Sequence, residues 1–219
     1  MIHFNLPKSL VDRESYILNT ARGKSVLHLG CADYPFTEER IANGSWLHSK
    51  ISSVSKSCVG FDLDAVTVNM LRDRYKVESL IVGDAEKLYM LAPQKFELII
   101  AGELIEHLNN PGLFLESARK VLKPRGMLII TTANAFCLRR MMRVPFGTES
   151  VHPDHTYYFS HTTLRTLVQR FGYVIIDAAS YRLPNRRPIL PYIVERMATW
   201  VSPNLGEGVV HTYMLNDSL

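Results

Sequence analysis

A short segment near the middle of the chain gathers side chains that could do acid–base or metal chemistry. It spans residues 102–108 and reads GELIEHL. If the segment is helical, its i, i+3 and i+4 spacing places Glu103, Glu106 and His107 on one face. Neighbouring carboxylates repel each other unless a cation or a proton lies between them. The spacing therefore predicts a divalent metal site, or else a plain first helical turn whose acids favour the helix N-terminus.

The later segment 152–155, with the sequence HPDH, could complete such a site. His155, or else His152, is expected to supply a fourth ligand. Mixed oxygen and nitrogen donors accept Mg²⁺, Mn²⁺, Fe²⁺ or Zn²⁺. A metal bound to a hydroxyl lowers the pKa of that hydroxyl, so an uncoordinated histidine nearby could remove its proton. Glu103, His152 and His155 are therefore the candidate catalytic residues.

Apolar runs alternate with helical patterns over the first two thirds of the chain. Strands are predicted at 26–29, 58–63, 80–82, 96–101 and 127–132. Helices are predicted at 8–22, 66–75 and 113–122. The run 96–101 is apolar almost throughout, as a strand buried on both faces must be. This alternation predicts an α/β fold with a doubly wound, mostly parallel sheet.

The last third of the chain adds a helix at 162–171 and two more strands, at 174–178 and 208–215. These two strands are expected to form a C-terminal antiparallel hairpin, which brings the sheet to seven strands. An inserted helix is predicted between them, at 188–203, because Ile193, Met197 and Trp200 recur at helical intervals. Its few positive charges favour a lid or a dimer contact over a membrane-surface helix.

Size, charge and cysteine content narrow the class of protein. A chain of 219 residues with 47% hydrophobic composition suits one well-buried domain. The formal charge of +4 suits an anionic substrate but falls short of a dedicated nucleic-acid binder. Three widely spaced cysteines favour a reducing cytoplasm over a disulfide framework. Neither a signal-peptide core nor a run of about 20 apolar residues is apparent, so no membrane span is expected.

Small and acidic residues follow three of the predicted strands. The segment 30–33 reads GCAD, Asp62 lies at the end of the second strand, and Asp84 follows the third. Residues of these kinds at the carboxyl edge of a parallel sheet suit a nucleoside ligand. Together with the fourth strand and the KPRG turn at 123–126, this ordered set resembles the class I S-adenosylmethionine-dependent methyltransferases, with a Rossmann-like fold.

The resemblance covers roughly residues 24–180 and implies how the cofactor is bound. In this family the first turn lets the backbone approach the methionine part of the cofactor. The acid after the second strand accepts both ribose hydroxyls, and the acid after the third accepts the adenine amino group. The implied cofactor-binding residues are Gly30, Cys31, Ala32, Asp62, Leu63, Asp84 and Ala85. The simpler role of the two acids would be to begin turns or cap helices.

The first turn departs from the family pattern. His28 stands where the family often has an acid, and Ala32 and Tyr34 stand where it often has glycines. A cofactor-binding protein without catalysis is therefore one alternative. A nicotinamide dehydrogenase would need G-x-G-x-x-G after the first strand, and the sequence GCADYP at 30–35 does not supply it.

The segment 103–107 is similar to the E-x-x-E-H element of two metal-using branches of the family. These are the ubiquinone-biosynthesis O-methyltransferases and the small-RNA 3′-terminal 2′-O-methyltransferases, of which the latter also carry a later Asp-His pair. The resemblance implies that Glu103, Glu106, His107 and His155 bind a metal. RNA ribose 2′-O-methylation is an alternative function, although the chain has no recognisable RNA-binding domain.

Arginines follow the fifth and sixth predicted strands and could bind an anionic acceptor, or simply solubilise the surface. They are Arg139, Arg140, Arg143, Arg182, Arg186 and Arg187. The whole chain resembles small methyltransferases associated with bacterial surface-polysaccharide synthesis. We therefore expect O-methylation of a saccharide or other small anionic acceptor by one domain, with homodimer formation an open question. Its expected parts are an N-terminal helix (1–23), a cofactor-binding half (24–134) and an acceptor-side half (135–219).

Overall fold

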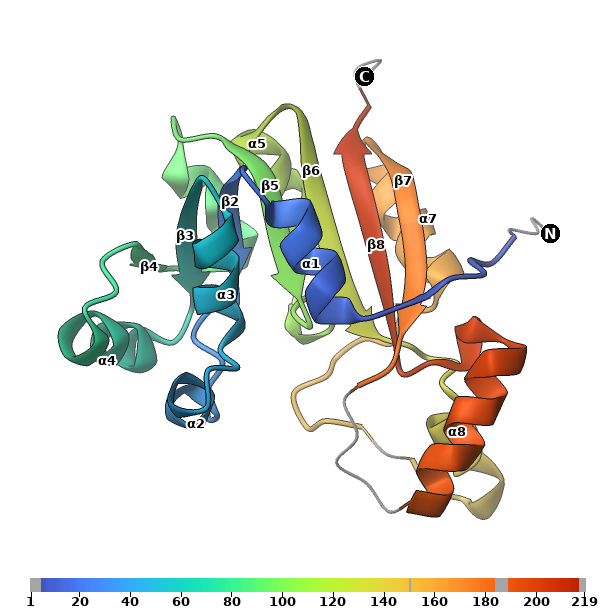
Figure 1. Cartoon of the computed structure of the whole chain (residues 1–219). Helices are drawn as coiled ribbons and strands as arrows, with labels where there is room; N and C mark the ends of the chain where they lie inside the picture. Colours follow the sequence, from blue (N-terminus) through green and yellow to red (C-terminus); the bar gives the residue numbers. More distant parts are fainter. Residues whose placement is uncertain (1–4, 150, 184–188, 217–219) are drawn as a thin grey trace.

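Eight strands form a single sheet in the order β1-β7-β8-β6-β5-β2-β3-β4 (Figure 1). The structure is a computed structural model and describes residues 5–149, 151–183 and 189–216. The strands are β1 (Leu10–Val11), β2 (Ser25–Leu29), β3 (Ser57–Asp62), β4 (Leu80–Val82), β5 (Phe96–Gly102), β6 (Leu122–Ala133), β7 (Tyr173–Tyr181) and β8 (Gly208–Leu215). β8 runs antiparallel to both β6 and β7, and the other neighbours are parallel. The predicted Rossmann-like sheet with an antiparallel C-terminal strand pair is confirmed.

The prediction of seven strands and of a helix starting at residue 8 was wrong. Leu10–Val11 forms the short strand β1, which pairs with the end of β7. Helix α1 begins only at Arg13, because the Asp12 carboxylate accepts a hydrogen bond from the Ser15 backbone N–H at 2.8 Å and caps the helix there. An edge strand of two residues is too short to show an alternating pattern in the sequence.

Helices cover both faces of the sheet. The α-helices are α1 (Arg13–Ala21), α2 (Thr37–Ala42), α3 (Leu47–Val54), α4 (Ala65–Tyr75), α5 (Pro111–Val121), α6 (Leu138–Met141), α7 (His161–Arg170) and α8 (Ile189–Val201). Four 3₁₀ helices are described, η1 (Ala85–Leu91), η2 (Ile105–His107), η3 (Val144–Phe146) and η4 (Pro203–Leu205). α1 and α3 bury their apolar side chains in one core, and α5 and α7 bury theirs in the core on the opposite face. The central strands lie between the two cores.

The turn predicted at 123–126 lies inside the long strand β6. The register between β5 and β6 jumps at this point, because Phe96 pairs with Leu122 while Leu98 pairs with Met127. Gly126 is required here, since a Cβ atom on it would lie 2.8 Å from the Lys123 carbonyl oxygen. The KPRG segment is thus a bulge that separates the end of α5 from the buried part of β6.

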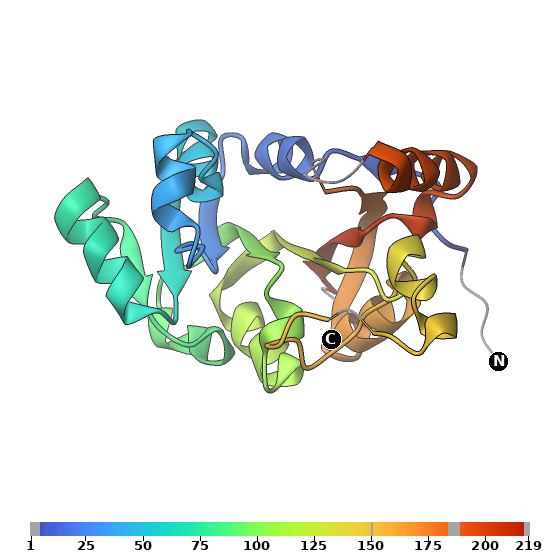
Figure 2. The ribbon, with the colours of Figure 1, turned by 90° about the horizontal axis from the view of Figure 1, so that it is seen from below.

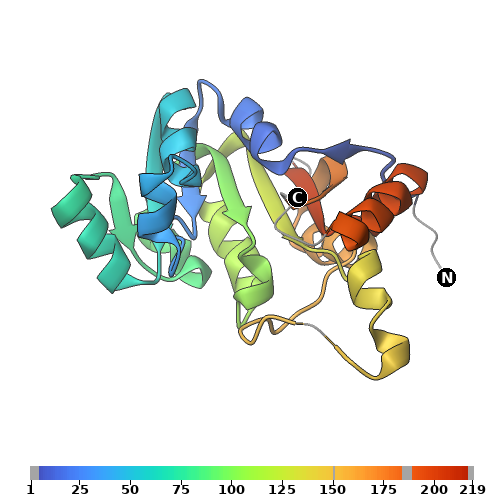
Figure 3. The same ribbon diagram turned by 60° about the horizontal axis from the view of Figure 1, so that its bottom comes forward.

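Below the carboxyl ends of the parallel strands, α8 packs beside α6 (Figures 2 and 3). The inserted helix expected at 188–203 is therefore present, although residue 188 lies outside the described residues. It ends at Val201, because Pro203 follows and begins the separate 3₁₀ helix η4. None of the helices in the described ranges has the length and apolar character that crossing a membrane requires.

Candidate functional site

Hydrogen bonds from neighbouring segments fix the loop that follows β2. Gly30 adopts a left-handed conformation with φ 68°, and its N–H donates to the Phe61 carbonyl at 2.9 Å. The next two residues, Cys31 and Ala32, are buried, and the Trp46 indole N–H donates to the Cys31 carbonyl at 2.9 Å. Burial raises the pKa of the Cys31 thiol, which therefore stays neutral. Of the three residues predicted in the first turn, only Gly30 is exposed.

Asp62, at the end of β3, connects this loop to the neighbouring strand. Its Oδ2 accepts a hydrogen bond from the Ala32 N–H at 2.8 Å, and its Oδ1 accepts one from the Asp64 N–H at 3.0 Å. Each carboxylate oxygen has a further lone pair for a ligand. The following residue, Leu63, leaves 72% of its surface exposed. A fixed carboxylate thus lies beside an exposed apolar side chain at the carboxyl edge of the sheet.

Asp84 follows β4, next to the end of β3, because the Gly83 N–H donates to the Asp62 carbonyl at 2.8 Å. Its side chain caps η1 by accepting a hydrogen bond from the Glu86 N–H at 2.9 Å. Its second oxygen lies 3.2 Å from the Lys87 ammonium nitrogen. The capping role considered for this acid is therefore present, and Ala85 forms the first residue of the helix that it caps.

Glu103 follows β5 directly and occupies a strained backbone conformation. Its φ is 51°, in the left-handed region that non-glycine residues seldom adopt. Its carboxylate accepts hydrogen bonds from the Tyr181 hydroxyl and, at 3.2 Å, from the Thr131 hydroxyl. Burial, and then the negative charge of Glu103, raises the pKa of the Tyr181 phenol, which stays a hydrogen-bond donor.

Arg13 completes this arrangement from the start of α1. Its Nε donates to the Thr131 hydroxyl at 2.9 Å, and its guanidinium lies 5.9 Å from the centre of the Tyr181 ring. Sequence reasoning missed both Arg13 and Tyr181. The sequence does contain an indication for Arg13. A cation in the first turn of a helix interacts unfavourably with the helix dipole, which indicates that Arg13 has a role outside the helix.

The segment 102–108 does not form the regular helix on which the i, i+3 and i+4 grouping depended. The segment makes only the 3₁₀ helix η2, since Glu103 turns away in its left-handed conformation and the His107 N–H bonds to the Leu104 carbonyl at 2.9 Å. The Glu106 side chain is buried, and its Oε1 accepts a long hydrogen bond of 3.4 Å from the Ala133 N–H. Burial, and then the charge of Glu103, raises the pKa of Glu106 to about 7.

Three histidines meet beside η2. Potential ligand nitrogens of His107, His152 and His155 all lie within 4.8 Å of one another. The loop that carries the last two is docked by Thr156, whose N–H donates to the Glu106 carbonyl at 2.9 Å. Burial, and then the neighbouring imidazoles, lowers the pKa of His107 and of His155. Neutral rings of this kind keep a lone pair free for a metal or a proton.

The carboxylates that the sequence grouped with these histidines point to other partners. Glu103 is bonded to Tyr181 and Thr131, and Glu106 faces the Ala133 N–H. The structure brings together His107 and both histidines considered as the fourth ligand, His155 and His152.

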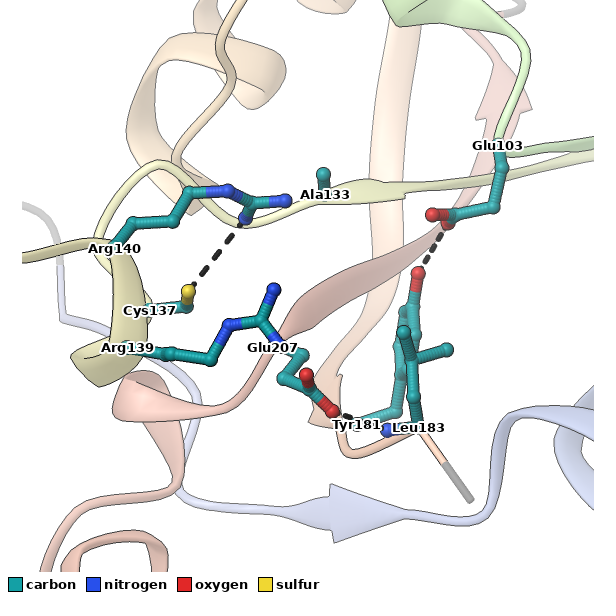
Figure 4. Close-up of a pocket in the computed structure, with 8 residues that line it drawn as sticks. All are labelled: Glu103, Ala133, Cys137, Arg139, Arg140, Tyr181, Leu183 and Glu207. Atoms are coloured by element: carbon teal, nitrogen blue, oxygen red, sulfur yellow. Dashed lines mark hydrogen bonds between the residues drawn. The ribbon is translucent and has the colours of Figure 1, made fainter. Parts of the chain in front are cut away.

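A small open pocket of about 70 Å³ lies where β5, β6 and β7 end (Figure 4). Its lining residues are Glu103, Ala133, Cys137, Arg139, Arg140, Tyr181, Leu183 and Glu207. Figure 4 shows the guanidinium groups of Arg139 and Arg140 across the pocket from the Glu103–Tyr181 pair. The pocket therefore offers two guanidinium groups on one wall and the Glu103 carboxylate on the other, with the Glu207 carboxylate between Arg139 and Tyr181.

Of the predicted arginines within the described residues, Arg139 and Arg140 line the pocket, and the other two do not. Arg140 is anchored, since it donates to the Asn134 carbonyl at 2.9 Å and lies 5.8 Å from the centre of the Tyr158 ring. Arg143 is exposed between α6 and η3, and Arg182 is half-buried just after β7. Arg186 and Arg187 lie outside the described residues.

Comparison with known proteins identifies the domain. Residues 3–178 match a family model described as "Methyltransferase domain". A Mycolicibacterium smegmatis protein named "Probable S-adenosylmethionine-dependent methyltransferase" is 26% identical over 155 residues, covering 71% of this chain and 54% of the relative. The ubiquinone biosynthesis O-methyltransferase of Chelativorans sp. is 30% identical over 116 residues, covering 51% of this chain and 41% of the relative. The chain thus spans about half the length of these curated relatives.

Solved structures show the same fold at lower sequence identity. Magnesium protoporphyrin IX methyltransferase from Synechocystis, with bound S-adenosylhomocysteine, superposes with a TM-score of 0.61 at 11% identity and covers 93% of this chain and 80% of that chain. The N-methyltransferase NodS from Bradyrhizobium japonicum, also with S-adenosylhomocysteine, gives a TM-score of 0.56 at 14% identity and covers 93% of this chain and 84% of that chain.

Proposed function

The chain belongs to the class I S-adenosylmethionine-dependent methyltransferases, and we propose that it methylates a hydroxyl group of a saccharide or other small anionic acceptor. The observation that carries this proposal is the pocket in which Arg139 and Arg140 face the Glu103–Tyr181 pair. O-methylation is also the activity in the names of the ubiquinone-biosynthesis relatives.

The adenosine part of the cofactor fits the residues after β3 and β4. Asp62 is fixed by two backbone donors and keeps lone pairs that suit a pair of neighbouring hydroxyls. Exposed Leu63 beside it offers an apolar surface for a ring. Asp84 and the Ala85 backbone, at the adjoining end of β4, would meet the adenine amino group. S-adenosylmethionine supplies a methyl group on a positively charged sulfur, which is already a good leaving group.

The methionine part of the cofactor is assigned to the loop after β2. Gly30 is the exposed residue there, and its φ of 68° disfavours a side chain at this position. Cys31 and Ala32 are buried behind it and would act by shaping the loop.

The acceptor would be oriented by charge and by hydrogen bonding. Arg139 and Arg140 carry donors that suit a phosphate or carboxylate. Glu103 lies on the pocket wall and is the residue we place against the acceptor hydroxyl, because Tyr181 and Thr131 fix its direction. By accepting a hydrogen bond from the acceptor, its carboxylate would hold the hydroxyl so that an oxygen lone pair points at the methyl carbon, opposite the C–S bond that breaks. The proton would pass to His155, whose ring burial keeps neutral, or else to His152.

A divalent metal fits the cluster of His107, His152 and His155. Three imidazole nitrogens favour borderline ions such as Zn²⁺ or Fe²⁺ over Mg²⁺. A bound ion would polarise the acceptor hydroxyl and lower its pKa. In that case the three histidines would be ligands, and Glu103 would take the proton. The hydrogen bonds of Glu103 and Glu106 use Oε1, and the buried Oε2 of Glu106 has no hydrogen-bond partner and could serve as a further ligand.

The proposal is tested by measuring S-adenosylhomocysteine release with a panel of neutral, phosphorylated and carboxylated saccharides. We expect turnover only with anionic acceptors, and Arg139→Gln should raise KM for them about tenfold through loss of a charged contact. Arg143→Gln is the matched control, because Arg143 is exposed outside the pocket. Equal effects of the two substitutions, or cofactor binding without turnover on any acceptor, would contradict the proposal.

A further inference from the structure

Over residues 193–201, helix α8 exposes large apolar side chains while Glu195 and Thr199 are buried. Its exposed large side chains are Ile193, Val194, Met197, Trp200 and Val201. At about 100° per residue, these five positions fall within an arc of about 120° on one face. Glu195 and Thr199 lie outside that arc and are only 8% and 2% exposed. This is the reverse of a surface helix in a protein that meets only water.

The neighbouring segment extends this apolar surface. α6 contacts α8, and α6 together with η3 exposes Met141, Met142, Val144 and Phe146. Figures 2 and 3 both show the two segments side by side at one end of the molecule. We call residues 138–146 and 193–201 the apolar lobe. Exposed apolar side chains gathered on two segments that pack together indicate contact with another apolar phase or molecule.

The charge on the apolar lobe is basic. Arg139, Arg143 and Arg196 are exposed on it, whereas the one acid among its residues, Glu195, is buried. An apolar face with tryptophan and flanking arginines is the composition of segments that lie in the interface of an anionic bilayer. The few positive charges of the helix alone favoured a lid or a dimer contact. With the exposed arginines of the α6–η3 segment included, the lobe carries the positive charge that a membrane-surface segment needs.

We propose that the apolar lobe docks on the surface of a bilayer containing anionic lipids. A second copy of this chain is a poorer occupant, because a two-fold interface through this lobe would bring the exposed arginines of both copies together. Arg139 and Arg140 also line the pocket, so docking would place the pocket beside the lipid headgroups. The docking itself does not depend on the function proposed above.

Vesicle co-sedimentation tests the proposal. The full chain is mixed with vesicles of phosphatidylcholine alone, or with about 30% phosphatidylglycerol added. We expect binding to the anionic vesicles that weakens in high salt, and a blue shift of tryptophan emission. That shift would report Trp200, since Trp46 is already buried. Trp200→Gln should reduce binding about tenfold and abolish the shift, and removal of Arg143 or Arg196 should each reduce binding about fivefold.

Met90→Gln is the matched control, because it removes an apolar side chain that is also largely exposed, from η1 instead of the apolar lobe, and should leave binding unchanged. The proposal is overturned if anionic vesicles do not bind the wild-type chain, or if Trp200→Gln and Met90→Gln bind alike. It is also overturned if light scattering shows a dimer that Trp200→Gln disperses while vesicles have no effect. Calorimetry with S-adenosylhomocysteine uses no vesicles. The cofactor assignment can therefore be tested separately even if vesicle binding is not observed.

Discussion

Replacing Asp62 with asparagine tests the cofactor site at the residue that contributes most to it. The carboxylate accepts from two backbone donors, Ala32 N–H at 2.8 Å and Asp64 N–H at 3.0 Å. Asparagine has a single acceptor oxygen, so one of these donors would face an NH₂ group and lose its partner. Each such loss costs about 1–3 kcal/mol of folding stability. In a chain of this size a loss of 2 kcal/mol lowers Tm by about 4–8 °C.

The same substitution should weaken cofactor binding more than it weakens the fold. Asparagine removes the charge from both hydrogen bonds to a ribose and keeps only one acceptor. Charge-assisted hydrogen bonds contribute about 1.5–3 kcal/mol each, so losing one and weakening the other costs about 3 kcal/mol. We therefore expect the Kd for S-adenosylhomocysteine to rise about 100-fold in calorimetry performed well below Tm.

Asp64→Asn provides the control for this experiment. Asp64 caps α4 by accepting from the Val66 and Thr67 N–H groups through Oδ1, and asparagine is an equally good N-cap, so this replacement should cost less than about 0.5 kcal/mol of stability. Asp64→Asn should leave the Kd for S-adenosylhomocysteine unchanged, because the Asp64 carboxylate accepts its hydrogen bonds from α4. An unchanged Kd for Asp62→Asn, or the same loss of affinity in both variants, would refute the assignment of Asp62 to the ribose.

Three further predictions follow from the site and the core. His107→Ala should remove a metal that survives buffer exchange in the wild-type chain, and elemental analysis showing no metal in either protein would rule out the metal site. Tyr181→Phe should lower kcat about tenfold and stability by about 1–2 kcal/mol, because Glu103 loses its phenol donor, and unchanged turnover would argue against a positioning role. His161 and His211 are buried with pKa values lowered by burial to about 4 and about 3, so the unfolded chain binds protons below its own pKa of about 6.5 while the folded chain stays neutral. The free energy of unfolding should therefore fall by about 1.4 kcal/mol per pH unit for each histidine as pH drops from about 6.5 toward 4, and equal urea midpoints at about pH 7.5 and about pH 5 would contradict this.

The main layout of the sheet could be predicted from the sequence because buried parallel strands have a strong local signal. The apolar run at 96–101 became β5, and the helix predicted at 66–75 became α4 with Asp64 as its cap. The structure of each of these segments can be predicted from its own hydrophobic pattern. The two-residue strand β1 has no such signal, since its pairing with β7 depends on residues about 170 positions away.

The chemistry of the site was harder to predict, because it depends on contacts between distant segments. Glu103 and His107 were grouped by helical spacing, and the left-handed turn at Glu103 separates them. Tyr181 reaches Glu103 from the end of β7, and His152 reaches His107 through the docked loop. The contact between Tyr181 and Glu103 leaves no pattern in the local sequence, whereas the histidines of the HPDH segment could be proposed as partners of His107 from their residue types.

A crystal structure of the chain soaked with S-adenosylhomocysteine would test the central claim most directly. We expect the ribose hydroxyls against the Asp62 carboxylate, the adenine beside Leu63, and the sulfur toward the pocket lined by Glu103. Density for this ligand at another place, or an Asp62 carboxylate with no ligand contact at saturating concentration, would contradict the assignment of this edge of the sheet to the methyl donor.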